Sequence, residues 1–167
     1  MTIDSYRFLD FASRKIIQAW VGRERERTPP PWTPMRKRLA DSTVALLATA
    51  GVARHDDRPF DEEGERRDPW WGDPSFRRIP LGTTERDVDL HHLHIDRRFG
   101  REDLDVVLPM RRLAELAAAG VVGKAAEVHY SIMGYQLRPA VLEQETAPAI
   151  ARELIAAGVD AVALVPA

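Results

Sequence analysis

The chain has 167 residues, which is typical of a single domain, since domains usually hold about 100 to 200 residues. Hydrophobic residues make up 44% of the sequence and charged residues 30%, which excludes disordered and fibrous proteins. The net charge of -2 gives no overall basic field, so we expect no nucleic-acid partner. The absence of cysteine excludes disulfides, thiolate metal clusters and a cysteine nucleophile within these residues.

The sequence contains no apolar stretch long enough to cross a membrane. The longest run without a formal charge, residues 42–53, has twelve residues, whereas a membrane-spanning helix needs about 20. The first seven residues include Asp4 and lack the apolar region of a secretory signal. We therefore expect a cytoplasmic protein with no membrane partner.

The first 34 residues differ in character from the rest. Apolar residues at helical spacing predict a helix over residues 1–27, which Asp4 or Ser5 could cap. The prolines of residues 29–34 cannot continue that helix, because proline lacks an N–H and fixes φ. We expect a helix and a Pro-rich strap over 1–34, then an α/β domain over 35–167 that is incomplete at its C-terminus, the whole treated as a single domain.

Short apolar runs alternate with helical patterns along the remaining chain. The helical patterns end at Gly120 and Gly158, because glycine readily adopts the left-handed conformation that terminates helices. The alternation predicts an α/β fold, a mostly parallel sheet of βαβ units with flanking helices. Two short apolar runs, residues 43–49 and 159–165, predict strands buried on both faces. The alternating residues 89–96 and the segment 127–133, which ends before Gly134, predict two more strands.

Residues 53–80 interrupt this alternation with carboxylates, arginines, prolines and glycines. They predict a long irregular loop, which in a compact domain is usually functional or disordered. The Arg/Glu runs at 23–27 and 62–67 are expected to be solvated faces.

Residues at the strand ends are the candidates for a binding site, because ligands of open parallel sheets lie beyond the carboxyl ends of the strands. Neither GxGxxG nor GxxxxGK[ST] follows a strand, so nucleotide binding has little support. The predicted substrate-binding residues are Thr49, Gly51, His94, Asp96, Ser131 and Gly134.

A histidine cluster at 91–96 is the most concentrated polar segment. Strand alternation would place His92, His94 and Asp96 on one face, and these groups could bind zinc or iron in a metal-dependent hydrolase. Arg97 and Arg98 would oppose a cation, so we predict no metal. His129 lies within a predicted strand and is expected to be a core histidine with its hydrogen bonds satisfied.

Several segments, in order along nearly the whole chain, resemble one protein family. They are Tyr6–Arg14, Pro31–Pro34, Thr49–Val52, Pro59–Asp61, Gly72–Arg77, His94–Asp96, Leu108–Leu116 and His129–Tyr135. These segments are similar to the amino-terminal part of the glycine/sarcosine/betaine/D-proline reductase component B family, the selenoprotein B subunits.

The resemblance implies reductive cleavage of a C–N bond in one of these amines. A selenolate attacks the α-carbon of an amine that is activated as a Schiff base by a pyruvoyl group on a partner subunit. No cofactor is then expected in this chain, and the expected partners are the pyruvoyl-containing subunit and redox proteins, in an oligomeric assembly. The family places selenocysteine, followed by cysteine, after an apolar-Pro strand end, so the resemblance implies a selenocysteine or cysteine just after Ala167. Selenocysteine is encoded by UGA, which gene calling reads as stop, so the 167 residues would be the amino-terminal portion of a longer selenoprotein.

Two alternatives stay open beside a reductase subunit or a truncated fragment of one. The first is a non-catalytic module of the same fold that binds a small ligand or assembles with other subunits. The second is the metal-dependent hydrolase that would use His92, His94 and Asp96.

Overall fold

The computed structural model describes residues 10–23, 33–68 and 70–167. The chain divides into two compact units, Met1–Pro34 and Met35–Ala167. In the first unit α1 spans Phe11–Arg23. The remainder of the predicted helix over 1–27, its proposed caps and most of the proline strap lie outside the described residues.

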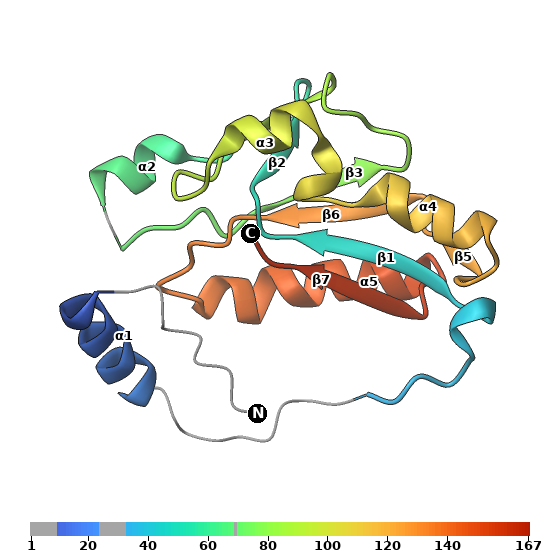
Figure 1. Cartoon of the computed structure of the whole chain (residues 1–167), viewed down its shortest axis with the longest axis horizontal. Helices are drawn as coiled ribbons and strands as arrows, with labels where there is room; N and C mark the ends of the chain where they lie inside the picture. The colour runs from blue at the N-terminus through green and yellow to red at the C-terminus, as the bar shows by residue number, and fades with distance from the viewer. Residues whose placement is uncertain (1–9, 24–32, 69) are drawn as a thin grey trace. The chain divides into compact units, whose positions relative to one another are not determined.

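The second unit is built on a mostly parallel sheet, which confirms the predicted fold class (Figure 1). Strand β1 is central: β7 pairs with one edge, and β5 and β6 pair with the other, all in parallel. Strand β3 then adds antiparallel to β6, and β2 and β4 form a separate antiparallel pair. The strands are β1 (Thr43–Ala48), β2 (Val52–Arg54), β3 (Phe76–Pro80), β4 (Val88–Leu90), β5 (Lys124–Ala125), β6 (Val128–Ile132) and β7 (Ala161–Val165).

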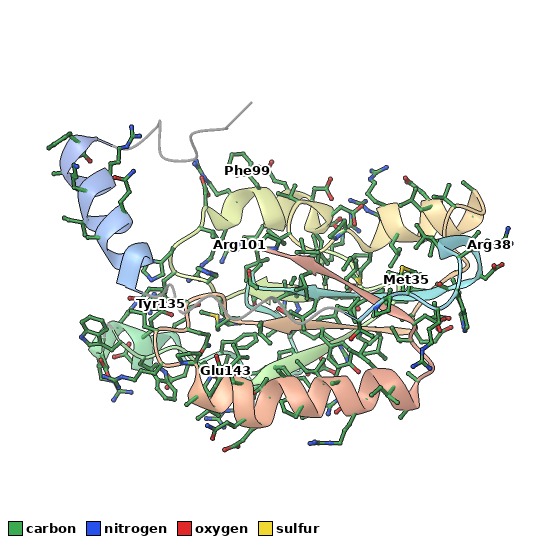
Figure 2. All side chains as sticks on the ribbon, turned by 90° about the horizontal axis from the view of Figure 1, so that it is seen from below. Met35, Arg38, Phe99, Arg101, Tyr135 and Glu143 are labelled. Carbon is green, nitrogen blue, oxygen red and sulfur yellow. The ribbon has the colours of Figure 1, made fainter. Side chains whose placement is uncertain are left out.

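Helices cover both faces of this sheet, as Figure 2 shows with α5 on one side and α3 and α4 on the other. The α-helices are α2 (Glu62–Arg67), α3 (Arg97–Glu102), α4 (Met110–Ala118) and α5 (Ala147–Ala156). Short 3-10 turns lie at Leu39–Asp41 and Leu104–Val106, and a π-helical segment, Leu142–Thr146, leads into α5. No helix within the described ranges is both long and apolar enough to cross a membrane.

The alternation of side chains along β1 divides the core into two layers. Val44 and Leu46 pack in the cluster that includes Leu113 of α4, whereas Ala45 packs in the cluster that includes Ile150 of α5. Successive strand residues point to opposite faces, so a strand covered on both sides must be continuously apolar. The continuous apolar sequence of β1 follows from this burial on both faces.

The helix ends follow from glycine at the predicted positions. Gly120 and Gly158 have φ of 71° and 69°, and each follows the last turn of its helix, as the sequence predicts. Pro148 lies in the first turn of α5, where a missing N–H is tolerated. The sequence also offers Thr146 as a cap for this helix, but the Thr146 hydroxyl donates to the carbonyl of Pro74 instead, so that prediction is wrong.

The prediction of an irregular loop over 53–80 is wrong in three places. The segment contains α2 and β3 and begins within β2. Helix α2 starts because the Asp61 carboxylate accepts the Gly64 N–H at 2.8 Å, and its glutamates lie at the positive end of the helix dipole. Strand β3 contains only five residues, one of them Pro80, and this brevity hides the strand signal.

Strand β7 differs from the expectation of a strand buried on both faces. None of its residues is buried, and Leu164 is 72% exposed. Within the part of the chain that the structure describes, β7 pairs only with β1 and forms an edge of the sheet. An apolar edge strand of this kind exposes both side chains and unpaired main-chain groups.

Candidate functional site at the carboxyl end of the sheet

The carboxyl ends of β1, β6 and β7 meet at one edge of the sheet because the three strands are parallel (Figure 1). Thr49, directly after β1, ties two of them together: its N–H donates to Val165 O at 3.1 Å. Its Oγ1 accepts the N–H of Ala167 at 2.9 Å. Thr49, a predicted site residue, therefore lies where the pairing between β1 and β7 ends.

Two glycines allow the chain segments at this edge to approach closely. Gly51 has φ of 63°, and its carbonyl accepts the N–H of His91 at 2.9 Å. A Cβ on Gly134 would lie 3.1 Å from His92 Nε2 and 3.0 Å from the carbonyl oxygen of Thr49. The structure thus brings Thr49, Gly51 and Gly134 together with the histidine segment.

The histidine segment itself is a loop rather than a strand. Strand β4 ends at Leu90, and its pairing with β2 ends there because the partner strand gives way to the left-handed Gly51. Asp96 then begins α3 as its N-cap, accepting the Arg98 N–H at 3.1 Å. The expectation that His92, His94 and Asp96 share one strand face is wrong.

Two predicted site residues, Asp96 and Ser131, have their side chains engaged in local hydrogen bonds. Asp96 is held by the Arg98 guanidinium, whose hydrogen bonds, with that of the Arg98 N–H, lower the pKa of the carboxyl to about 2. Ser131 is fully buried, and its hydroxyl accepts the Val52 N–H at 2.7 Å. The Ser131 side chain therefore fastens β2 to β6.

His92 lies at the edge of the sheet, close to Gly134. The sequence pattern indicates this residue only as a ligand of the metal-dependent hydrolase. The residue is 5% exposed, and its Nδ1 accepts the His94 N–H at 3.1 Å. Its carbonyl accepts from Arg97 Nε at 2.9 Å. Burial lowers the pKa of His92, and the charges of His94 and Arg97 lower it further, so the ring is neutral at neutral pH.

His94 links this loop to Tyr135 and to helix α2. The centroid of its ring lies 4.4 Å from that of Tyr135, which is labelled in Figure 2. Its Nε2 lies 2.8 Å from Glu65 Oε1, at ion-pair distance. The orientation of the two groups does not make a hydrogen bond, and both Glu65 oxygens are buried without one among the described residues.

Helix α2 contributes a buried acid, Glu65, and a half-buried one, Glu62, to the site. The expectation that residues 62–67 form a solvated face is therefore wrong for these two residues, whereas Glu63, Arg66 and Arg67 are exposed. Glu65 is 5% exposed, and Glu62 Oε1 lies 3.1 Å from His91 Nδ1 and 2.8 Å from Arg97 Nη1. Burial alone would raise the pKa of Glu62, but the hydrogen bond from Arg97 and nearby positive charges bring it below its usual value. Asp61 followed by acidic residues was the sequence signal for this helix start.

An apolar cavity of about 390 Å³ lies between the sheet and α5 and reaches the same edge. Its lining includes Thr49 at the end of β1, Leu164 of β7 and Ile150 of α5. The edge therefore offers polar groups from the histidine loop and an apolar surface from the strands.

The positions of His92, His94 and Asp96 do not support the metal-dependent hydrolase. Asp96 caps a helix and His92 is turned toward Gly134. Within residues 10–23, 33–68 and 70–167, no group of three His, Asp or Glu side chains is placed to hold a metal ion.

Comparison with known proteins gives consistent matches. A family model described as glycine/sarcosine/betaine reductase selenoprotein B matches residues 24–167. The D-proline reductase subunit gamma of Acetoanaerobium sticklandii is 36% identical over 138 residues, which cover 82% of this chain and 54% of that protein. The glycine reductase complex component B subunit gamma of Carboxydothermus hydrogenoformans is 30% identical over 141 residues, 83% of this chain and 31% of that protein. No solved structure matches the chain.

The chain spans about half the length of the first relative and about a third of the second. The family model covers most of the sequence, including β1, the histidine loop, β6 and β7. The chain belongs to the glycine/sarcosine/betaine reductase selenoprotein B family.

Proposed function

We propose that the chain forms the amino-terminal part of a subunit in a multi-subunit amino-acid reductase complex. The observation that carries the proposal is the family match over residues 24–167, supported by relatives named as D-proline reductase and glycine reductase subunits. The reaction is reductive cleavage of the C–N bond of a small amine such as glycine, sarcosine, betaine or proline.

The reaction takes place at the carboxyl edge of the sheet. As a selenolate or thiolate forms a bond to the α-carbon, the C–N bond breaks and its electron pair leaves with the nitrogen, which takes up a proton. One thiol of a dithiol donor then attacks the selenium or sulfur, the bond to the α-carbon breaks and the carbon takes up a proton, and the second thiol releases the selenolate or thiolate as the donor becomes a disulfide. A polarisable anion of low pKa suits this step because it is a strong nucleophile at neutral pH.

The selenocysteine or cysteine expected just after Ala167 stays a prediction. A residue at that position would enter the edge beside Thr49, since Ala167 N already donates to Thr49 Oγ1. The codon that follows Ala167, read from the gene, tests this part of the proposal. UGA followed in frame by a cysteine codon supports it, and UAA or UAG without a continuing frame contradicts it.

A pyruvoyl group on a partner subunit would activate the amine when the complex is assembled. The contribution of this chain is the edge itself, where Thr49 and His92 pack closely against Gly134. The proposed partners are that subunit and the redox proteins that reduce the complex.

Purification of the full-length gene product from its natural source, with its partner subunits, tests the function. We expect reduction of at least one of glycine, sarcosine, betaine and D-proline by a dithiol donor. The 167-residue chain alone should be inactive, because it contains no cysteine. A complete complex that binds an amine but cleaves none of them would favour the non-catalytic binding module.

A further inference from the structure

The face of β7 that carries Val162 and Leu164 is apolar and open. Leu164 is 72% exposed, and Val162 is only partly buried against the cluster that includes Ile150 of α5. The apolar cavity of about 390 Å³ lies beside these two residues, and Thr49 is the one polar residue among those described in its lining. A small-molecule site usually combines an apolar lining with several polar groups, so this lining is better suited to apolar side chains of a polypeptide.

The outer edge of the same strand is open as well. Within the described residues β7 pairs with β1 alone, so the other edge presents unpaired main-chain groups. Parallel strands are normally covered on both faces and continue through a helix to the next strand. The matched residues make up 54% and 31% of the two relatives, so these relatives have further chain that could supply a helix and a strand.

The handedness of the sheet decides on which face such a helix would lie. The chain passes from β1 through α3 and α4 to β5 on one edge of β1, and from β6 through α5 to β7 on the other edge. These two connections run in opposite directions across the sheet, and their helices cover opposite faces (Figure 2). Connections between parallel strands are right-handed in nearly all proteins. A strand beyond β7 would continue in the direction from β6 to β7, so its helix must lie on the face of α5.

We propose that the open face of β7 is the docking surface for the first helix that follows Ala167 in the full-length subunit. The helix packs beside α5 and fills the cavity with its apolar side chains, and the strand after it pairs in parallel with the outer edge of β7. This inference rests on the proposed function, in which the subunit continues beyond Ala167. The reactive residue then lies in the turn between β7 and the docked helix, and Thr49 holds the start of that turn through the Ala167 N–H.

Hydroxyl-radical labelling read by mass spectrometry tests which face is covered. The full-length gene product, with the reactive codon changed to a serine codon, is compared with the 167-residue chain at the same low concentration. Labelling of Leu164 should fall about tenfold in the full-length protein, because the side chain changes from 72% exposed to buried. Ile155 is the control: it is 76% exposed on α5 and lies outside the lining of the cavity, so its labelling should not change.

A pair of variants tests whether Leu164 is part of the docking surface. In the full-length protein Leu164→Lys should raise the rate of proteolysis after position 167 about tenfold, because loss of one apolar contact weakens docking by about that factor. Ile155→Lys, which introduces the same charge on α5 away from the cavity lining, should leave the rate unchanged.

Several results would overturn the proposal. One is unchanged labelling of Leu164 in the full-length protein, and another is equal protection in the 167-residue chain, since a second copy would then cover the face. Protection of Val165, which packs on the opposite face of β7, without protection of Leu164 would contradict the handedness argument. A gene without a continuing frame after Ala167 would also reject the docked helix. An active complex with Leu164 exposed rejects the docking alone, whereas a protected Leu164 in a complex that cleaves no amine rejects the proposed function alone.

Discussion

The main-chain N–H of Leu46 in β1 donates a 3.1 Å hydrogen bond to Nδ1 of His129 in β6. A side chain therefore takes the place of a main-chain carbonyl in the ladder between the two strands, at the break between β5 and β6. His129 is fully buried, and its Nε2 has no hydrogen-bond partner among the described residues. The expectation of a core histidine is confirmed, but only one of its two nitrogens is satisfied.

This arrangement predicts a loss of stability in mild acid. Burial lowers the pKa of His129 from 6.5 to about 4. The unfolded chain binds the proton first, so the free energy of unfolding falls as pH drops from about 6.5 toward 4, by up to about 3 kcal/mol. Urea unfolding at a series of pH values measures the loss.

The matched variant is His129→Asn, whose side-chain oxygen can accept from Leu46 N but cannot titrate. We expect this variant to lose stability more gently than the wild type between pH 6.5 and 4. The carboxylates are common to both proteins, so the difference isolates the histidine. An identical pH dependence in the two proteins would contradict the assignment.

Ser131→Ala should lower stability rather than ligand affinity. The change leaves the buried Val52 N–H without its 2.7 Å acceptor, which costs about 1–3 kcal/mol. Thermal or urea unfolding measures the loss. Ser42→Ala is the control, because the Ser42 hydroxyl donates to the Arg38 carbonyl, so its loss leaves no buried N–H unpaired. Unchanged stability of the Ser131→Ala protein would contradict this structural role.

Gly51→Ala should destabilise the fold more than Gly120→Ala. Both glycines have positive φ, 63° and 71°, so alanine at either position costs about 1–2 kcal/mol in backbone strain. Only at Gly51 would the new Cβ also meet another group, 2.6 Å from Met133 Sδ; at Gly120 nothing lies within 4 Å. The difference in unfolding free energy between the two variants measures the close approach, and equal losses would argue against it.

Leu164→Lys should reduce self-association of the 167-residue chain. Leu164 is 72% exposed on the β7 edge, and a lysine on an edge strand opposes pairing with another strand. Sedimentation at increasing concentration measures the association, and the change should alter stability by no more than about 0.5 kcal/mol.

The control for the edge is Ile155→Lys, which replaces a 76% exposed apolar side chain on α5. It should leave association unchanged if the β7 edge is the contact. Equal effects of the two variants would show that exposed apolar area in general, rather than the edge, drives association.

The sequence by itself determined the central strands and the ends of two helices. The apolar run 43–49 and the segment 127–133 predicted β1 and β6 to within two residues at each end, and Gly120 and Gly158 marked the ends of α4 and α5. These signals are local, because burial on both faces and a left-handed terminator each impose a choice of residue at the position itself. The fold class could therefore be predicted from the pattern of apolar residues and glycines.

In the segment 53–80 the spacing of apolar residues fails to predict the secondary structure. Helix α2 and strand β3 contain six and five residues, too few to establish a pattern. Their order comes from capping by Asp61 and from pairing with β6, a strand distant in sequence.

At the candidate site, the rule that ligands bind at strand ends identified Thr49, Gly51 and Gly134. Only the tertiary structure assigned the roles of the polar side chains. Ser131 turns inward to Val52, and His92 turns toward Gly134 because the His94 N–H fixes its ring. The sequence shows which segments have residues that fit a strand or a helix. The direction of a side chain in a loop depends instead on contacts with residues that are distant in sequence and meet only in the folded chain.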